Sequence, residues 1–316
     1  MNEKEYPMTF DEFVRSFSTE EQCRDYLAKL RWPDGFECPE CKNKKYWPVD
    51  NVLFACSECP YRTSVIAGTI FHGTRTSLKS WFTAIWWVTT QKNGASAEGL
   101  QQVLGLKSYE TAWAWLHKIR KAMVRSDRTK LSGTIEVDEC YIGGEEHSKS
   151  RGRGTGNKVL VVVAVELKEK GKRGLRKLGR VRLGVVVDAT KESLVSFIKD
   201  NIEAGSEIIT DGFASYSSLS ESNYTHTVYV QKKVETDEEK LPHVHLIVSL
   251  LKRWLLGTHQ GAVSEKHLQS YLDEYVFRFN RRNAAKRGLL FYRLLEGAVS
   301  TKPTTLGELY DMTEDF

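Results

Sequence analysis

Two pairs of closely spaced cysteines constrain the fold more than any other feature of this 316-residue chain. The pairs are Cys38-Pro-Glu-Cys41 and Cys56-Ser-Glu-Cys59, with 14 residues between them. Four thiolates from two such motifs can surround one zinc ion tetrahedrally, with each sulfur about 2.3 Å from the metal. Residues 45–56 between the pairs alternate in the manner of a β-hairpin, as a zinc ribbon requires. The spacing therefore predicts a zinc ribbon.

Two unrelated redox CxxC motifs are the alternative interpretation of these cysteines. The duplication, the spacing and the adjacent short strands all favour zinc. Because four cysteines fill a tetrahedral site and leave no position for a substrate, the zinc is expected to be structural. The chain has six cysteines, and we expect the remaining two, Cys23 and Cys140, to be buried apolar side chains.

The composition is ordinary for a globular protein and its charge is mildly basic. Lys and Arg number 46 against 41 Asp and Glu, and the net charge of +5 is compatible with nucleic-acid binding without establishing it. Basic residues concentrate in 149–182 and 252–287. No apolar run approaches the roughly 20 residues that span a membrane, and the N-terminus lacks a signal-peptide pattern. We expect a cytoplasmic protein, associated with the nucleoid if DNA is its partner.

The spacing of apolar residues predicts a small N-terminal module, a helical middle and a C-terminal α/β region. The first helix is expected to be capped by Thr9 or Asp11. Its buried face is expected to hold Phe10, Phe13, Phe17, Cys23 and Tyr26. The predicted divisions are an N-terminal helical segment at 1–30, a zinc ribbon at 31–73, a helical region at 74–130, an α/β domain at 131–300 and a tail at 301–316.

Residues 96–120 resemble a helix-turn-helix. Ser96 is expected to cap the first helix, Gly105 to end it, and Ser108 to cap the second. The second helix ends in basic residues that include Lys118 and Arg120, and in such a motif it enters the major groove of DNA. An ordinary helical hairpin with cations at its C-terminal end is the alternative. We expect the tryptophans of this region to be core residues: Trp81, Trp86, Trp87, Trp113 and Trp115.

An acid interrupts the apolar strand predicted at 134–142. Strand alternation puts Glu136, Asp138 and Cys140 on one face and Ile135, Val137 and Glu139 on the other. An acid within a buried strand is costly unless something such as a metal ion compensates it. A second acid, Asp211, follows the short strand predicted at 208–210, at the sheet edge where α/β proteins bind ligands. Taken singly, each acid is equally well explained as a cap or turn residue.

The order of these elements is that of a ribonuclease-H-like domain: an acid on the first strand, a three-stranded meander, a crossover helix, then an acid on the fourth strand. Two such acids can hold two Mg²⁺ or Mn²⁺ ions about 3.5–4 Å apart. On the later helix predicted at 243–256, His245, Ser249 and Lys252 form a polar stripe. His245 is the candidate third ligand and would favour Mn²⁺. A merely hydrogen-bonded histidine is the alternative, with His243 or Glu274 as substitute ligands.

With these features, the chain resembles bacterial insertion-sequence transposases that join an N-terminal zinc ribbon to a DDE-type, ribonuclease-H-like catalytic domain. The matching stretches include DEFVRSFSTEEQCRDYLAKLRWPDGFECPEC, VDECYIGG, TDGFASYSSL and the long segment from VHLIVSLLKRW to FRFNRRN. The resemblance implies that Asp138 and Asp211 are the first two metal-binding aspartates and that Lys252 contacts DNA. The sequence departs from the family pattern at the third acid, where His245 stands in place of the usual glutamate.

The resemblance implies a transposase that binds the terminal inverted repeats of its element and catalyses metal-dependent DNA strand cleavage and strand transfer. Its partners would be double-stranded DNA, at the element ends and the target, and further copies of itself. Additional DNA contacts are expected from Arg253, beside Lys252, and from a basic loop containing Arg151 and Arg153. Two other hypotheses are a catalytically inactive, transposase-derived DNA-binding regulator and a metal-dependent DNA nuclease.

Overall fold

The computed structural model describes residues 6–50, 52–125, 127–143, 158–170, 176–229, 241–260, 263–284 and 286–311. Contacts divide the chain into two compact units, and each is described by itself. Unit 1 contains the described residues up to 125 together with 283–311, and unit 2 contains those between 126 and 282. The α/β domain expected to extend to residue 300 therefore ends earlier, because the last helices return to the N-terminal unit.

Unit 1 has a helical core rich in aromatic side chains. Its described helices are α1 (Phe10–Ser16), α2 (Glu20–Arg31), α3 (Leu78–Thr90), α4 (Ala97–Leu104), α5 (Tyr109–Ala122), α9 (Arg287–Ser300) and α10 (Leu306–Asp311). Helix α9 packs against α2, α3 and α5 and brings Phe291 against Phe13, Phe82 and Trp86. These long-range contacts explain why the C-terminal helices belong to unit 1.

The N-terminal prediction is confirmed in part. The Thr9 hydroxyl accepts a hydrogen bond from Glu12 N–H and caps α1. The segment is two helices rather than one, since Thr19 begins α2 with a capping box. Phe13, Phe17 and Cys23 are buried as expected, but Phe10 is 62% exposed, so its predicted burial was wrong. With α1 only seven residues long, Phe10 is in its first turn, on the side away from the core.

The caps predicted for the helix-turn-helix-like segment are confirmed. Ser96 accepts from Gly99 N–H at the start of α4, and Ser108 accepts from Thr111 N–H at the start of α5. Gly105 ends α4 with φ +61°, a left-handed conformation that favours glycine. The prediction of core tryptophans is also confirmed for Trp81, Trp86 and Trp115, which are almost fully buried.

A three-stranded antiparallel sheet follows α2 in unit 1. Its strands are β1 (Tyr46–Val49), β2 (Leu53–Cys56) and β3 (Arg62–Ser64), in the order β1-β2-β3. Strands β1 and β2 form the hairpin expected between the cysteine pairs, with Tyr46 opposite Cys56 and Val49 opposite Leu53. The sheet therefore carries two zinc-ribbon cysteines at or near its strand ends.

Unit 2 is built on a five-stranded mixed sheet with the order β6-β5-β4-β7-β8. Strands β4 (Thr134–Ile142), β5 (Val159–Lys170) and β6 (Arg176–Val186) form an antiparallel meander. Helix α6 (Lys191–Asn201) then leads to β7 (Glu207–Thr210), which lies parallel to β4, and β8 (Thr225–Val228) lies parallel to β7. This topology confirms the ribonuclease-H-like order, and β8 is a strand that the apolar pattern did not predict.

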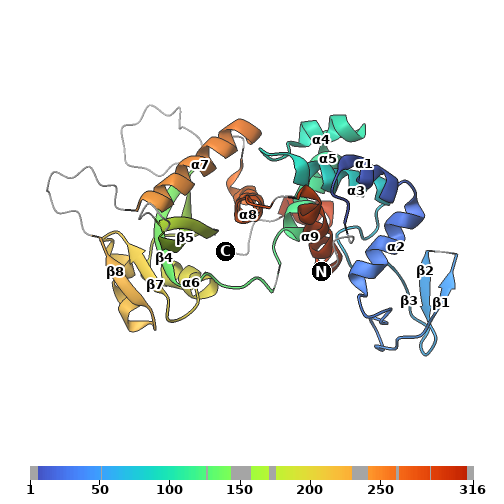
Figure 1. Cartoon of the computed structure of the whole chain (residues 1–316), viewed down its shortest axis with the longest axis horizontal. Coiled ribbons are helices and arrows are strands. Elements are labelled where there is room, and N and C mark those ends of the chain that lie inside the picture. Colours follow the sequence, from blue (N-terminus) through green and yellow to red (C-terminus); the bar gives the residue numbers. More distant parts are fainter. Residues whose placement is uncertain are drawn as a thin grey trace. The chain divides into compact units, whose positions relative to one another are not determined.

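Helices cover both faces of this sheet, as Figure 1 shows for α7 in orange and α6 in yellow. Helices α7 (Pro242–His259) and α8 (Leu268–Asn280), the latter preceded by the 3₁₀ turn η2 (Glu265–His267), pack on one face. Helix α6 and the 3₁₀ helix η1 (Ala214–Glu221) pack on the other. Both faces of β5 are therefore apolar, which accounts for its continuous run of valines. Among the described helices, none has the length and apolar character needed to cross a membrane.

Candidate metal centres and DNA-contacting residues

The four predicted zinc ligands come together in unit 1. The sulfur atoms of Cys38, Cys41, Cys56 and Cys59 all lie within 4.8 Å of one another. Cys41 Sγ is 3.4 Å from Cys56 Sγ, and Cys38 Sγ is 3.7 Å from Cys59 Sγ. These separations are too long for disulfides and close to the roughly 3.8 Å edge of a tetrahedron with metal–sulfur bonds of about 2.3 Å. The cluster fits a structural zinc ion.

The surroundings of the cluster hold the cysteines in place. Trp32, Phe36 and Phe54 pack around Cys38, Cys56 and Cys59 as a small hydrophobic core. The Glu58 N–H and the Asn43 side-chain amide both donate to Cys56 Sγ, and such hydrogen bonds stabilise a metal-bound thiolate. The two remaining cysteines differ from the cluster: Cys23 is fully buried, and Cys140 packs against the core beneath α7.

In unit 2, sheet register brings the two predicted aspartates together. Strand β4 pairs with β7 so that Ile135 is opposite Ile208 and Glu136 is opposite Ile209. Continuing this parallel register by two residues places Asp138 beside Asp211, on backbones about 4.8 Å apart. The charge of Asp211 acts on the Asp138 carboxyl, as this proximity requires. His245 reaches the same point from α7, with its Nε2 3.4 Å from Asp138 Oδ2. The structure therefore gathers three side chains that are distant in sequence.

The electrostatics of this carboxylate site are those of two neighbouring carboxyl groups that repel each other and are compensated only in part. Burial raises the pKa of Asp138, and the negative charge of Asp211 raises it further. The Glu139 N–H and His245 act in the opposite direction. A divalent cation would remove the repulsion between the two carboxylates, so the donor set fits Mg²⁺ or Mn²⁺. Among the described residues, only the cysteine set gathers three or more ligand atoms within 4.8 Å, so the carboxylate site is more open than the zinc site.

Glu136 fixes the helix that carries His245. It is 4% exposed and lies on the same face of β4 as Asp138. Its Oε2 accepts from the backbone N–H groups of His243 and Val244, and its Oε1 is 2.7 Å from His243 Nδ1. Helix α7 has no side-chain cap of its own, so a carboxylate from the sheet satisfies its N-terminus. Strand alternation indicated the face of Glu136, but nothing in the sequence indicated this partner.

Glu139 forms a second connection, on the other face of β4. The Tyr216 hydroxyl donates to Glu139 Oε2 at 2.7 Å. Tyr216 belongs to η1, which begins shortly after Asp211. The Oδ1 atom of Asp211 accepts a hydrogen bond from the Phe213 N–H in the turn between them. Burial raises the pKa of Glu139, the Tyr216 hydrogen bond lowers it, and the charges of Asp138 and Asp211 raise it. The Glu139–Tyr216 pair therefore ties the Asp211 turn to the strand that carries Asp138.

Two residues of β4 thus organise the carboxylate site. Glu136 holds the N-terminus of α7, and Glu139 holds the turn after β7. His243, considered above as a substitute ligand, is engaged with Glu136. Glu274, the other substitute, is 1% exposed and paired with Arg278. Neither substitute therefore replaces His245 beside Asp138.

The two basic residues predicted on α7 differ in their positions. Lys252 is exposed, and its charge opposes the burial that raises the pKa of the Cys140 thiol to about 11. Lys252 therefore lies near the β4 face that carries Asp138 and Cys140. Arg253 is also exposed, but its charge acts on Tyr275 of α8. Of the two, Lys252 is the one close to the carboxylate site.

The basic residues predicted on α5 are largely covered. Arg120 is only 2% exposed, so the expectation that it presents its guanidinium to DNA is not supported. Lys118 is half-buried, and this burial lowers its pKa against the opposing charge of Glu308. Helix α5 packs against α9 and α10, and the Tyr310 hydroxyl of α10 donates a hydrogen bond to Glu110 in the first turn of α5. The exposed residues of α5 are those of this first turn, Tyr109–Thr111. Arg151 and Arg153 lie outside the described residues.

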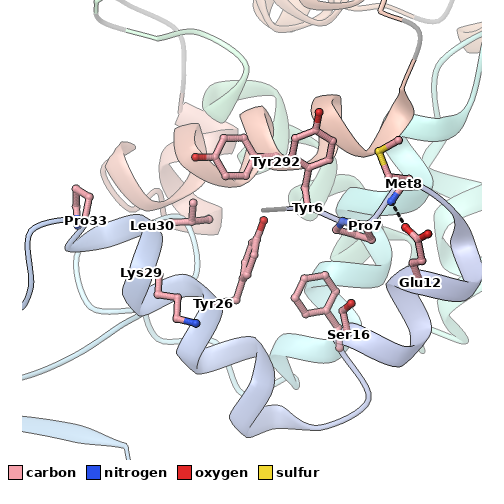
Figure 2. Close-up of a pocket in the computed structure, with 11 residues that line it drawn as sticks. Tyr6, Pro7, Met8, Glu12, Ser16, Tyr26, Lys29, Leu30, Pro33 and Tyr292 are labelled. Carbon is pink, nitrogen blue, oxygen red and sulfur yellow. Dashed lines mark hydrogen bonds between the residues drawn. The ribbon is translucent and has the colours of Figure 1, made fainter. Parts of the chain in front are cut away.

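A cavity of about 850 Å³ lies in unit 1 and belongs to neither metal centre. It is walled by three tyrosines, Tyr6, Tyr26 and Tyr292, which converge from the N-terminal segment, α2 and α9 (Figure 2). Glu12 at its rim accepts from Met8 N–H. None of the residues predicted from the sequence as ligands or DNA contacts lines it.

Comparisons with known proteins agree with both halves of this description. Residues 18–62 match the family model of the transposase zinc-ribbon domain, and residues 130–280 match that of the ISXO2-like transposase domain. The chain is 26% identical over 280 residues to an uncharacterized protein in transposable element ISH50 of Halobacterium salinarum. That alignment covers 84% of this chain and 92% of the relative. Since Halobacterium is archaeal, the group is wider than the bacterial family expected above.

A solved structure also shows a distant likeness. One chain of a simian T-cell lymphotropic virus intasome, in complex with PP2A regulatory subunit B56 gamma, is 14% identical, with a TM-score of 0.31. The match covers 67% of this chain and 74% of that one, and a likeness of this size supports no argument. The two domain matches together cover more than half of the chain, in the order zinc ribbon then transposase domain. The chain therefore belongs to the insertion-sequence transposases that combine a zinc ribbon with an ISXO2-like transposase domain.

Proposed function

We propose that this transposase cleaves and joins DNA at the ends of its own element, using Asp138, Asp211 and His245 to hold its catalytic metal ions. Two observations carry the proposal: His245 Nε2 lies 3.4 Å from Asp138 Oδ2, and the parallel register of β4 and β7, continued by two residues, sets Asp211 beside Asp138. When bound, a pair of Mg²⁺ or Mn²⁺ ions supplies activation of the attacking oxygen and stabilisation of the departing one.

The protein's own residues position this chemistry. Asp138 and Asp211 would hold the ions, while Glu136 and Glu139 keep α7 and the Asp211 turn in register with β4. Lys252 would neutralise a phosphate of the bound strand beside the carboxylates. Hydrolysis frees a 3′-hydroxyl, and the same site then directs that hydroxyl to a target phosphodiester, since both steps are in-line displacements.

Recognition of the element ends is assigned to unit 1. The zinc ribbon and the α4–α5 segment would bind the terminal repeats. Because the exposed part of α5 is its first turn, Tyr109 and Thr111 are better placed than Lys118 to approach the bases. Acting on two ends at once requires at least two copies of the chain, so we expect a homo-oligomer on DNA.

Strand cleavage and joining on duplexes that carry the element's own ends test this proposal. Wild type would be compared with Asp138→Asn, Asp211→Asn and His245→Ala in Mg²⁺ and in Mn²⁺. We expect both aspartate variants to lose cleavage and joining by more than about 100-fold while still binding the ends. His245→Ala should lose more activity in Mn²⁺ than in Mg²⁺, because imidazole is the softer ligand.

The alternatives predict different results in the same assay. Specific end binding by wild type without cleavage in either metal would indicate a DNA-binding regulator. Cleavage without joining would indicate a nuclease. Full activity in Asp138→Asn would refute the proposed ligand set.

A further inference from the structure

We propose that the outer face of the zinc-ribbon sheet binds unpaired bases of a DNA strand, with Trp47 as the stacking platform and Lys45 and Arg62 as the phosphate contacts. This inference rests on the proposed role of the ribbon in end recognition. It adds a defined surface and a defined ligand class to that role, namely single-stranded rather than duplex DNA.

The register of the sheet places these residues on one face. Trp47 is opposite Ala55 of β2, and Ala55 is opposite Arg62 of β3. Directly opposed residues point to the same side of a sheet, so Trp47, Ala55 and Arg62 form one row across three strands. With strands about 4.8 Å apart, the two outer positions of this row are roughly 10 Å apart at the backbone. The small side chain of Ala55 leaves the space between them open.

The opposite face of the same sheet is already occupied. Tyr46 and Phe54 lie on that inner side, and their rings contact each other and Phe36. Those contacts belong to the core around the zinc ligands. The inner face therefore supplies the stability of the ribbon, and the outer face is left for another use.

Trp47 is an unusual residue to leave on the surface. It is 66% exposed, and among the described residues no other ring packs against it. Tryptophan offers a large planar apolar surface, so an exposed one beside exposed cations is a candidate contact for a ligand. A planar aromatic ring on an open sheet suits the π-face of a base, which is accessible only when the base is unstacked.

The charge on the Trp47 face favours a nucleic acid strand over a protein as the partner. Lys44 and Lys45 directly precede the strand, and Lys45 falls on the Trp47 face two residues before it. Lys45 and Arg62 are exposed, and neither forms an ion pair with another described residue. By contrast, Lys42 is paired with Glu37. Exposed cations and an exposed aromatic ring on one face combine the two elements of single-strand binding surfaces.

Binding to a fluorescently labelled 15-nucleotide oligo-dT and to a 15-bp duplex, at one fixed salt concentration, tests the inference with the full chain. Trp47→Ala should raise the Kd for oligo-dT about 10-fold, which corresponds to about 1.4 kcal/mol, and change the duplex Kd by less than about twofold. Trp47→Phe should stay within about threefold of wild type, because it keeps a ring. Arg62→Ala should weaken binding and reduce its salt dependence.

Phe10→Ala is the matched control. Phe10 is a similarly exposed aromatic residue of the same unit, but acidic side chains follow it in α1, so its removal should leave both Kd values unchanged. Zinc content, measured on each variant, verifies that the ribbon is folded. The binding assay does not require DNA cleavage. A wild-type protein that fails to cleave DNA would therefore refute the proposed function without affecting this test.

Three results would overturn the inference. One is an oligo-dT affinity of Trp47→Ala equal to that of Phe10→Ala. Another is an equal loss of oligo-dT and duplex binding in Trp47→Ala, which would indicate a backbone contact without stacking. The third is a loss of self-association in Trp47→Ala with unchanged DNA binding, which would make the face a protein interface.

Discussion

Replacing Glu136 with alanine tests the connection between the sheet and the helix that carries His245. The substitution removes three hydrogen bonds to a buried carboxylate, two from the backbone N–H groups of His243 and Val244 and one with the His243 ring. A hydrogen bond to a charged group contributes about 1.5–3 kcal/mol, and loss of a helix cap costs about 0.5–2 kcal/mol. Because water can reach the half-buried His243, these contributions do not add fully, and we expect a loss of about 3 kcal/mol.

Differential scanning calorimetry measures this loss. For a unit of this size, 1 kcal/mol corresponds to about 2–4 °C, so the affected transition should fall by about 6–12 °C in Glu136→Ala. Glu136→Gln keeps a hydrogen-bond acceptor but loses the charge, so its transition temperature should fall by roughly half as much. The control is Glu192→Ala, an exposed acid in the first turn of α6, which should shift the transition by less than about 2 °C. A Glu136→Ala transition within 2 °C of wild type would refute the capping role.

Three further substitutions test the zinc cluster, the Glu166–Arg180 ion pair and the glycine cap of α4. Cys56→Ser should reduce the zinc content, measured by elemental analysis, from about one ion per chain to near zero. Cys23→Ser, outside the cluster, should keep its zinc. Retention of zinc in Cys56→Ser would contradict the ribbon assignment. Glu166→Gln should lower the free energy of unfolding by about 2 kcal/mol at pH 7. Burial raises the pKa of Glu166, but the hydrogen bonds from Arg180 and Ser132 together outweigh burial and lower it. Because the pKa of Glu166 is lower in the folded state, its ionisation stabilises the fold above the unfolded value of about 4.3. In urea unfolding, the difference in free energy of unfolding between wild type and Glu166→Gln should vanish as the pH falls through the folded-state pKa. A difference independent of pH would contradict this. Gly105→Ala should lower the free energy of unfolding by about 1 kcal/mol in the same assay. The cost comes from the φ of +61° alone, since no atom lies within 4 Å of an added Cβ. An unchanged free energy of unfolding would contradict a left-handed cap at this position.

Local sequence rules predicted the parts of the structure that depend on neighbours in the chain. Ser96, Gly105 and Ser108 delimit α4 and α5 where their capping chemistry indicated. The period of two in β4 put Asp138 on one face and Glu139 on the other, and the two cysteine pairs defined the ribbon. These features need no knowledge of distant residues.

Features that depend on distant partners could not be predicted in this way. Arg120 stands near the end of a helix, where a cation is usually solvated, yet it is 2% exposed, and α9 returns from the C-terminus to pack against α5. The capping of α7 by Glu136 joins residues more than 100 positions apart. Strand β8 is short and mostly polar, so only its pairing with β7 identifies it. The roles of Asp138, Asp211 and His245 as ligands stay a prediction.

Manganese binding to the purified protein tests the ligand role of these residues most directly. Electron paramagnetic resonance counts free Mn²⁺, and wild type would be titrated beside Asp138→Asn, Asp211→Asn and the control Asp200→Asn, an exposed acid of α6. We predict that wild type and Asp200→Asn bind Mn²⁺ alike and that each of the other two variants binds at least about 10-fold more weakly. Equal Mn²⁺ binding by all four proteins would contradict a metal site at Asp138 and Asp211.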